Sequence, residues 1–461
     1  MRPRGMAGVL AGLLGVALVG GCTTPGTARK SSGKAPQTRQ AEWSIHPSEK
    51  SGKIVAAQAI GTSVVVVYEH EVAVLDRRTG KQRWSVGAEF PNNLQPAEHS
   101  VRVTPDALVL LLEPEPGRHE PGTAIVYDLA TGKKRATRAY YSDGTAHVAV
   151  TADTLLVETG TATNPGEEPA TYALESVDLK TGRQLWSHDY GDLRPQIQPG
   201  PGDNPLYDRP RRDPLLAQDS TLAALRGYEK SGRSHVYRTR IIDPRTGRTV
   251  GDPAETPQGS TVSLLDDRQY AVWDNDDGTD CGTSVSGYQM TGDTRAWQLD
   301  LAAWRNETRP ECTDLWEPMM VERRLLTYTP EEHPILVDPA SGKTVWTGPE
   351  GFYPIGVAGD VVAGRDSRGD NAVVAYDISR SRRLWDARDV GEGIYFRSST
   401  VVPGYLILAA GSDEVWTYHL RTGKKLLCAG AHQPIGAGDG WLVAGEPGDT
   451  GDKTELRYFA L

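Results

Sequence analysis

The sequence predicts an all-β protein, a single β-propeller of four-stranded antiparallel blades. Three observations predict it: an Asp- and Gly-rich turn recurs eight times, extended apolar segments flank each turn, and successive turns lie roughly 40 to 65 residues apart. That period has room for four short strands. The 50 Gly and 31 Pro residues agree with dense turns, and no segment shows sustained helical periodicity.

The turn and the residues after it form a repeat, clearest in residues 76–84 (DRRTGKQRW), 178–186 (DLKTGRQLW) and 338–346 (DPASGKTVW). The Asp side chain can hydrogen-bond the turn backbone, and the Gly supplies the positive φ of a tight hairpin. The Trp would cover the seam with the adjacent blade. The residues that we assign to this docking repeat are Asp76, Gly80, Trp84, Asp178, Gly182, Trp186, Asp338, Gly342, Trp346, Asp377 and Trp385.

The other units depart from this pattern. Weaker copies of the turn begin at Asp128, Asp243, Gln289, Asp377 and His419. Residues other than Trp stand at the Trp position in three units, and Ser replaces the Gly in one: Ala136, Gly251, Leu427 and Ser381.

The first unit illustrates the expected strands. Residues 64–67 (VVVV) form a continuous apolar run, as expected of an inner strand that is buried on both faces. Residues 72–75 (VAVL) form the next strand, and the segment after Gly80 forms the outer one.

The pattern Asp-x-x-Thr-Gly-Lys-x-x-Trp resembles the tryptophan-docking repeat of the PQQ-binding-like β-propellers over about residues 41–461. That family includes quinoprotein dehydrogenases and the propeller lipoprotein of the outer-membrane barrel-assembly machinery, and the resemblance is to a bacterial, actinobacterial, lipoprotein of this kind. It implies the fold strongly. It implies function weakly, because Trp and Gly serve packing and the family hosts both enzymes and scaffolds.

The number of blades is less well determined than the fold. Counting every unit, with a three-strand remnant near residues 441–461, gives nine, whereas eight is the number usual for the family that the chain resembles. We predict eight blades within a range of seven to nine. We also predict that the N-terminal segment 41–45 pairs with the C-terminal strand and so closes the ring.

The N-terminus resembles a lipoprotein signal. Arg2 and Arg4 precede an apolar stretch, and residues 19–22 (VGGC) match a lipobox, so residues 1–21 would be cleaved and Cys22 would be lipidated. An ordinary secretory signal with an incidental Cys is the alternative. Residues 22–40 are polar and basic, typical of a flexible tether, and residues 41–461 form the propeller domain.

Charge separates the tether from the body of the protein. Six Lys or Arg and no acid precede Ala41, which leaves 44 basic and 60 acidic residues for the propeller. A nucleic-acid partner is therefore not expected.

Three cysteines lie in the predicted propeller. Cys281 and Cys312 fall in loops at the same face, and we expect a disulfide between them, closing a loop of about 31 residues at roughly 3 to 4 kcal/mol. Two unpaired surface thiols are the alternative. Cys428 stands in an apolar run and is expected in the core.

Loop length predicts where a partner binds. The turns on one face are uniformly short, whereas the other face collects long connections such as residues 190–214 and 274–282. Variable loops on a rigid scaffold typically carry binding, so the long-loop face is the candidate surface. Merely solvated loops are the alternative.

Chemical motifs are few. We find no paired His motif and no Gly-x-Ser-x-Gly elbow, and therefore predict no catalytic, cofactor-binding or metal residues. The sequence favours a monomeric, non-enzymatic scaffold on the extracytoplasmic side of the cell membrane, whose partner is an envelope or secreted protein. The alternative is a quinoprotein dehydrogenase-like oxidoreductase, although the adjacent Cys pair typical of the alcohol dehydrogenases of that type is not present.

Overall fold

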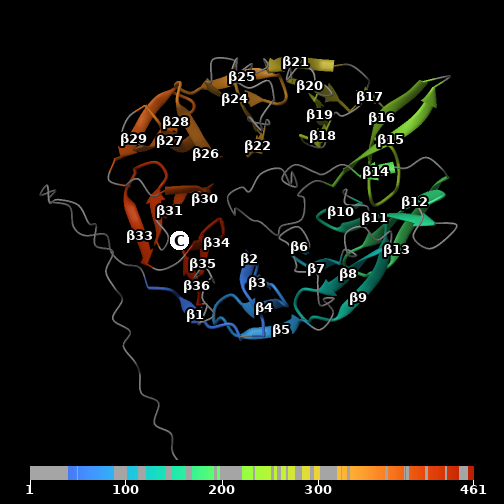
Figure 1. The fold of residues 1–461 in the computed structure, drawn as a ribbon, viewed down its shortest axis with the longest axis horizontal. Helices are drawn as coiled ribbons and strands as arrows, with labels where there is room; N and C mark the ends of the chain where they lie inside the picture. The colour runs from blue at the N-terminus through green and yellow to red at the C-terminus, as the bar shows by residue number, and fades with distance from the viewer. Residues whose placement is uncertain are drawn as a thin grey trace, which may run out of the picture.

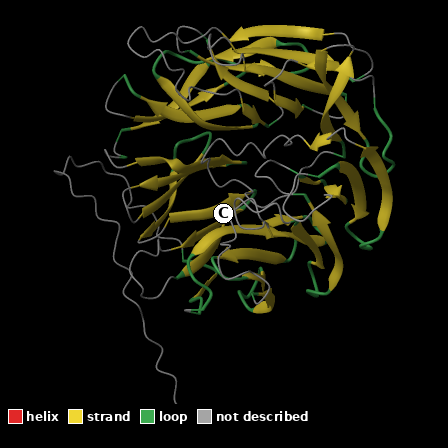
Figure 2. Cartoon of the chain, turned by 45° about the vertical axis from the view of Figure 1, so that its right-hand side comes forward, coloured by secondary structure: helices red, strands yellow, loops and turns green. Residues whose placement is uncertain are grey.

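A computed structural model gives the fold, a ring of sheets around a central axis (Figure 1). It describes residues 40–48, 50–87, 101–112, 121–141, 147–161, 169–191, 195–197, 221–231, 234–250, 254–256, 261–265, 268–275, 283–290, 295–301, 319–322, 324–329, 333–368, 372–388, 390, 394–410, 414–430, 433–445 and 455–461. Within these ranges every regular element is a strand, as Figure 2 shows.

The strands form nine four-stranded antiparallel sheets, which we number blade 1 to blade 9 around the ring. Blades 1 to 3 are β2 (Ile54–Ile60), β3 (Ser63–Tyr68), β4 (Val72–Asp76) and β5 (Gln82–Val86); β6 (Val101–Val103), β7 (Ala107–Leu112), β8 (Gly122–Asp128) and β9 (Lys134–Tyr140); and β10 (Val148–Val150), β11 (Thr154–Thr161), β12 (Thr171–Asp178) and β13 (Gln184–Gly191).

Blades 4 to 6 are β14 (Pro195–Ile197), β15 (Ala223–Ser231), β16 (Ser234–Ile242) and β17 (Ala254–Thr256); β18 (Thr261–Leu264), β19 (Gln269–Asn275), β20 (Thr283–Gln289) and β21 (Arg295–Leu301); and β22 (Met319–Val321), β23 (Arg324–Tyr328), β24 (Pro334–Asp338) and β25 (Lys343–Thr347). Blades 7 to 9 are β26 (Phe352–Ala358), β27 (Val361–Asp366), β28 (Ala372–Asp377) and β29 (Arg382–Ala387); β30 (Ile394–Val402), β31 (Tyr405–Ala410), β32 (Glu414–His419) and β33 (Lys425–Gly430); and β34 (Gln433–Gly438), β35 (Trp441–Gly445), β36 (Leu456–Ala460) and β1 (Trp43–Ile45).

The prediction of eight blades is wrong, since the described residues alone contain nine sheets. The sequence has only eight Asp- and Gly-rich turns because blade 9 is assembled from both ends of the chain and has no turn before its outer strand. That outer strand is β1, which pairs antiparallel with β36, with Trp43 opposite Tyr458 and Ile45 opposite Leu456. This is the pairing of the two ends that the sequence predicts.

The inner strands bury both of their faces. Every residue of β3 is buried, which explains the unbroken apolar run at residues 64–67. Successive side chains of a strand point to opposite faces, so Val64 and Val66 pack toward blade 9, and Val65 and Val67 pack toward blade 2. One strand therefore contributes to two separate hydrophobic cores.

The hydrophobic core is divided among the seams between blades. Nine clusters of buried side chains are present in the described residues, one for each pair of neighbouring blades. The cluster between blade 9 and blade 1 joins Trp441 and Tyr458 to Val64 and Leu75, with Trp43 packed in the same cluster. The ring is thus held by equivalent apolar contacts on both sides of every blade.

Two sets of turns lie on the same face of the ring. In blade 1 the amide of Arg77, just after the third strand, donates to the carbonyl of Thr62 between the first two strands at 2.9 Å. Equivalent bonds in other blades run from Leu129 to Asp106, Leu179 to Asp153, Ile378 to Asp360 and Leu420 to Gly404. In blade 9 the C-terminal Leu461 takes this place and donates to Gly440 at 3.0 Å.

We call this side, which carries turns such as residues 61–62 and 77–81, the short-turn face. The strands of the opposite side are joined by connections such as residues 87–100, 276–282 and 302–318, and we call it the long-loop face. The connection 198–222 instead joins β14 to β15, the first two strands of blade 4, so it begins and ends on the short-turn face. The expectation that residues 190–214 belong to the long-loop face is therefore wrong for the part that follows β14. The first strand of each blade lies nearest the axis and the fourth lies at the rim (Figure 1).

Removing the strand that completes blade 9 should destabilise the whole ring. Deletion of residues 41–46 exposes the edge of β36 and removes the buried side chain of Trp43. Loss of a buried Trp side chain alone lowers the free energy of unfolding by about 3 to 5 kcal/mol. We expect the thermal midpoint to fall by several degrees, measured by circular dichroism. A deletion of equal length in the tether, residues 31–36, serves as the control, and an unchanged midpoint in the 41–46 deletion would contradict the role of β1.

Candidate functional site

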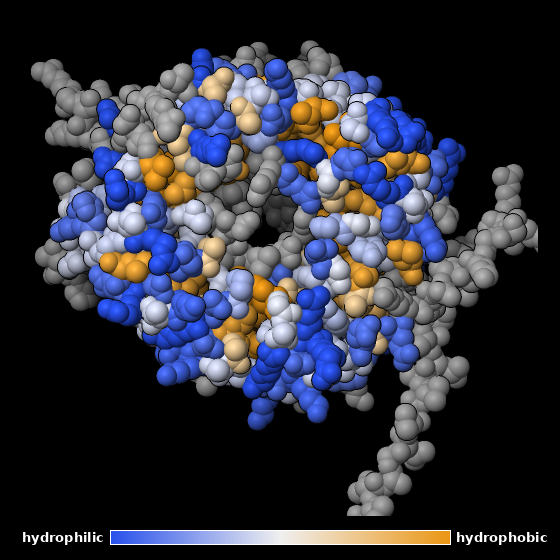
Figure 3. All heavy atoms as spheres, turned by 180° about the vertical axis from the view of Figure 1, so that it is seen from behind, coloured by the Kyte–Doolittle hydropathy of each residue, from blue (hydrophilic) through white to orange (hydrophobic). Residues whose placement is uncertain are grey.

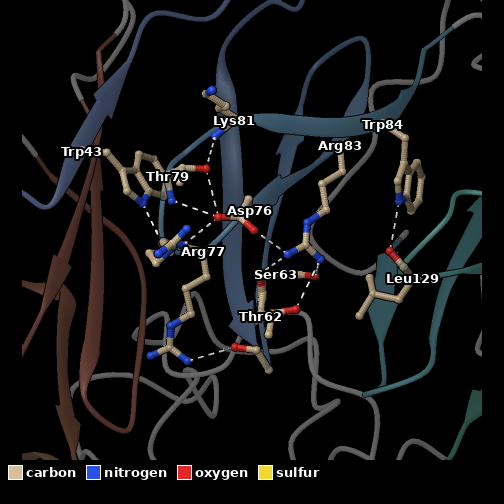
Figure 4. Close-up of polar contacts among 12 residues, drawn as sticks. Trp43, Thr62, Ser63, Asp76, Arg77, Thr79, Lys81, Arg83, Trp84 and Leu129 are labelled. Carbon is tan, nitrogen blue, oxygen red and sulfur yellow. Dashed lines mark hydrogen bonds and ion pairs between the residues drawn. The ribbon is translucent and has the colours of Figure 1, made fainter.

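Six of the turns before the outer strands are built around one carboxylate each, from Asp76, Asp128, Asp178, Asp243, Asp338 or Asp377. In blade 1, Asp76 Oδ1 accepts hydrogen bonds from the amide of Thr79 at 3.0 Å and from its hydroxyl at 2.9 Å (Figure 4). The Arg83 guanidinium donates to Asp76 Oδ2 at 2.6 Å, and this bond, followed by those from Thr79, lowers the pKa of Asp76 to about 2. The same Asp–Thr pairing recurs at Asp128–Thr131 and Asp178–Thr181.

Five of the turns receive a tryptophan from the preceding blade. The indole Nε1 of Trp43 donates to the carbonyl of Arg77 at 2.8 Å, and that of Trp84 donates to the carbonyl of Leu129 at 3.0 Å (Figure 4). In both cases the acceptor is the residue directly after the turn Asp. The same bond joins Trp186 to Pro244 in blade 4, Trp297 to Pro339 in blade 6 and Trp385 to Leu420 in blade 8.

The turn glycine is required for two reasons. Gly80 has a φ of 68°, in the left-handed region that side chains other than Gly rarely adopt. A Cβ atom at Gly80 would also lie 2.7 Å from the ring of Trp43, and a Cβ at Gly132 would lie 2.7 Å from the ring of Trp84. The glycine therefore allows the turn and the close approach of the indole together.

In blade 2 an arginine replaces the tryptophan as the donor to the next turn. Ala136 stands at its Trp position, and the adjacent Arg135 Nη1 donates to the carbonyl of Leu179 at 2.9 Å, the equivalent acceptor in blade 3. Arg135 also pairs with Asp128 of its own blade. A guanidinium thus makes the hydrogen bond that an indole makes elsewhere, a substitution that the Trp pattern in the sequence does not reveal.

The turn that lacks glycine is the irregular one. Ser381 of blade 7 has a φ of 47°, and the tryptophan of the preceding blade, Trp346, donates no hydrogen bond in the described part of the chain. Trp346 is instead only 3% exposed and packs against Phe352 and Tyr376 within the seam. Its indole therefore stabilises the seam by burial rather than by docking on the turn.

Several predicted residues lie outside the described part of the chain. These are Cys22, Cys281, Cys312, residues 198–220 and most of the long connections of the long-loop face, including residues 276–282. Cys428 lies in β33 opposite Trp416, and the placement of its side chain is outside the description as well. The expected lipidation, disulfide and binding surface accordingly stay predictions.

A buried polar pair, which the sequence does not single out, lies near the long-loop end of blade 3. His147 Nδ1 and Glu158 Oε2 are 2.8 Å apart, and their side chains are 1% and 0% exposed. The ring of Tyr141 packs edge-on against His147 with centroids 5.2 Å apart. The one signal in the sequence is that Glu158 interrupts the apolar run Leu155 to Val157 of an inner strand.

The described residues show neither a grouped set of metal ligands nor a membrane-spanning helix. In the ranges that the structure describes, no three His, Cys, Asp or Glu side chains are grouped as ligands for a metal ion. No helix among the described residues has the length and hydropathy of a membrane span.

Breaking the buried pair should cost more stability than breaking an exposed one. Glu158→Ala leaves His147 buried without this carboxylate, and we expect a loss of about 3 to 5 kcal/mol in unfolding free energy. Asp386→Ala, which removes the exposed partner of Arg383, should cost about 0 to 1 kcal/mol. Denaturant unfolding measures both values. Equal losses in the two variants would contradict the importance of the buried pair.

Comparison with known proteins identifies the family of the chain. A family model described as outer membrane protein assembly factor BamB matches residues 68–287 and 281–447. No curated protein sequence matches. The solved structures similar to the chain include BamB from Moraxella catarrhalis, at 12% identity with 91% of this chain and 99% of that chain covered and a TM-score of 0.41.

Two further solved structures are a europium-containing methanol dehydrogenase, at 11% identity with 92% and 93% covered and a TM-score of 0.42, and a eukaryotic initiation factor, at 10% identity with 86% and 90% covered and a TM-score of 0.50. Identities this low speak for the fold alone. The family model, by contrast, spans most of the ring from β3 to β35. The chain therefore belongs to the family of PQQ-like repeat β-propellers described as outer membrane protein assembly factor BamB.

Proposed function

We propose that the protein is a lipid-anchored, extracytoplasmic scaffold that binds an envelope or secreted protein through its long-loop face. The observation that carries this proposal is the unequal construction of the two faces. Outside blade 4, turns on the short-turn face span two to five residues, as at 61–62 and 77–81, and carboxylates such as those of Asp76 and Asp338 are already held by Thr, Ser or Arg side chains. The long-loop face has the connections whose length and sequence differ from blade to blade.

Family membership supports an interaction role. The matching family is described as an assembly factor, which is a protein that acts by contacting other proteins. A ring with nine rigid seams is suited to this, because the strands hold the ends of the long connections in fixed relative positions. A scaffold of this kind needs no catalytic group of its own, and we propose that the protein is not an enzyme.

The N-terminus supports a place at the membrane. The lipobox at residues 19–22 and the basic, polar segment that follows are typical of a lipoprotein held on the outer side of a membrane. A protein anchored there meets envelope proteins and secreted proteins before any others.

The decisive experiment maps the contacts of each face in the native envelope. The photo-crosslinker p-benzoylphenylalanine is placed at residues 93, 277 or 310 on the long-loop side and, as matched controls, at residues 82, 184 or 344 next to the short turns. We expect one protein to be crosslinked from the long-loop positions and not from the controls. The reverse pattern would refute the assignment of faces, and PQQ-dependent alcohol oxidation by the purified protein would favour the dehydrogenase instead.

Anchoring depends on one thiol. The change Cys22→Ala should abolish lipidation and either release the chain to the medium or leave its signal peptide uncleaved, because the diacylglyceryl group has no other acceptor. Metabolic labelling with a fatty acid measures this, and Cys428→Ala is the control that keeps the label. Label that persists in the Cys22→Ala protein would show that the anchor lies elsewhere.

The proposed disulfide should stiffen the binding face. If Cys281 and Cys312 are linked, a non-reduced digest gives one crosslinked peptide pair, and reduction weakens partner capture because the loops must then be ordered on binding. Alanine changes across residues 274–280 should abolish capture in detergent solution, whereas Arg183→Ala and Lys343→Ala should leave it unchanged. Alkylation of both thiols without reduction would show that the disulfide is not formed.

A further inference from the structure

The tether joins the propeller at the short-turn face. Strand β1 runs away from that face, so the residues before it lie there: the amide of Glu42 donates to the carbonyl of Tyr458 at 2.9 Å, and Trp43 docks on the turn carbonyl of Arg77. The C-terminal Leu461 lies at the same face, bonded to Gly440. An anchor N-terminal to Gln40 is therefore connected to the ring at the short-turn face.

The tether is short compared with a path around the rim. A flexible segment the length of residues 23–40 has a root-mean-square end-to-end distance of about 25 Å. With the anchor at Cys22, the face from which the chain leaves is the one held nearest the membrane. To place the long-loop face against the membrane, the tether would have to run the length of the rim strand β1 in addition.

Exposed cations occupy one fixed position in the turns of this face. Five residues after the turn Asp or His, the chain places Lys81, Lys133, Arg183, Arg248, Lys343 and Lys424 in blades 1, 2, 3, 4, 6 and 8. All six side chains are exposed, and none of them forms an ion pair in the described part of the chain. The neighbouring turn carboxylates, such as Asp76, are already bonded to Thr and Arg side chains.

This positive charge stands on a propeller that is acidic as a whole, with 44 basic and 60 acidic residues after Gln40. The cations are distributed around the ring instead of being concentrated in one patch. Hydrophilic groups spaced around the rim, with a hollow at the centre, are visible on one face in Figure 3. Charge spread over a ring complements a plane of diffuse negative charge better than it complements one acidic site of a protein.

We propose that the short-turn face lies against an anionic phospholipid surface, so that the long-loop face points away from the membrane toward its partner. This inference rests on the proposed anchor at Cys22. The tether brings the face to the membrane, and the ring of cations keeps it there by attraction to anionic headgroups, which falls off within a Debye length. Lys on an outer strand can also guard an edge against aggregation, and that role alone would give no lipid contact.

The orientation is tested on the full-length lipidated protein in vesicles of phosphatidylcholine with or without an equal amount of phosphatidylglycerol. A photo-crosslinker stands at Thr344, beside the short turns, or at His70, in the connection between β3 and β4 on the long-loop face. Mass spectrometry counts lipid adducts. We expect adducts at Thr344 to exceed those at His70 at least tenfold in anionic vesicles, and to fall at high salt.

Charge reversal provides the matched comparison. The triple change Lys81→Glu, Lys133→Glu and Lys343→Glu should lower the Thr344 adduct yield at least tenfold, because each cation near an anionic surface contributes roughly a fivefold preference. The triple change Lys50→Glu, Lys53→Glu and Arg388→Glu alters the total charge equally on the long-loop side and should leave the yield unchanged. Equal yields at Thr344 and His70, or equal effects of the two triple changes, would overturn the proposal.

Two further readouts separate the possible failures. Fatty-acid labelling of Cys22 is measured on the same preparation: absence of label refutes the anchor, whereas label with equal adduct yields refutes the orientation alone. In native membranes, adducts at Thr344 that consist of an acidic protein instead of lipid would show that a protein partner covers this face, and would also overturn the proposal.

Discussion

The ring depends on the hydrogen bond between an indole at the rim of one blade and a turn carbonyl of the next. Inner strands such as β3 bury both faces, so every seam must be closed by a neighbour, and apolar contacts alone have no direction. The Trp bond supplies direction at the five seams that have it, because it fixes one point of a blade against its neighbour. Arg135 preserves the bond without an indole, whereas Trp346 preserves the buried ring without the bond.

The sequence predicts most of this fold because the turn chemistry is local. Asp76, Thr79 and Gly80 lie within one turn, so their spacing is visible without tertiary information. The blade number could not be obtained in the same way, since blade 9 has no such turn and combines β1 with β36 from opposite ends of the chain. Counting turns therefore gives one unit too few, and the usual blade number of the family led to the same error.

The candidate site was less predictable, for a different physical reason. His147 and Glu158 come from different segments of blade 3 and meet only when β10 pairs with β11. Arg135 looks like an ordinary outer-strand cation until the neighbouring turn is in place. For the long-loop face the sequence predicts where a partner binds but not which residues bind it, because these loop sequences follow no repeat. The turn sequences of the short-turn face do repeat, and their Asp carboxylates stabilise the turns themselves.

The construction of blade 9 also constrains the order of events during synthesis. Strand β1 is made first, yet its partner β36 is made last, and the bond from Arg77 to Tyr458 joins residues 381 positions apart. The ring consequently stays open until the final residues are available, and a chain cut short near its C-terminus keeps an unpaired edge and an uncovered seam. Such a fragment would be open to proteolysis and to pairing with other chains, so the complete ring acts as a structural check that the whole chain has been made.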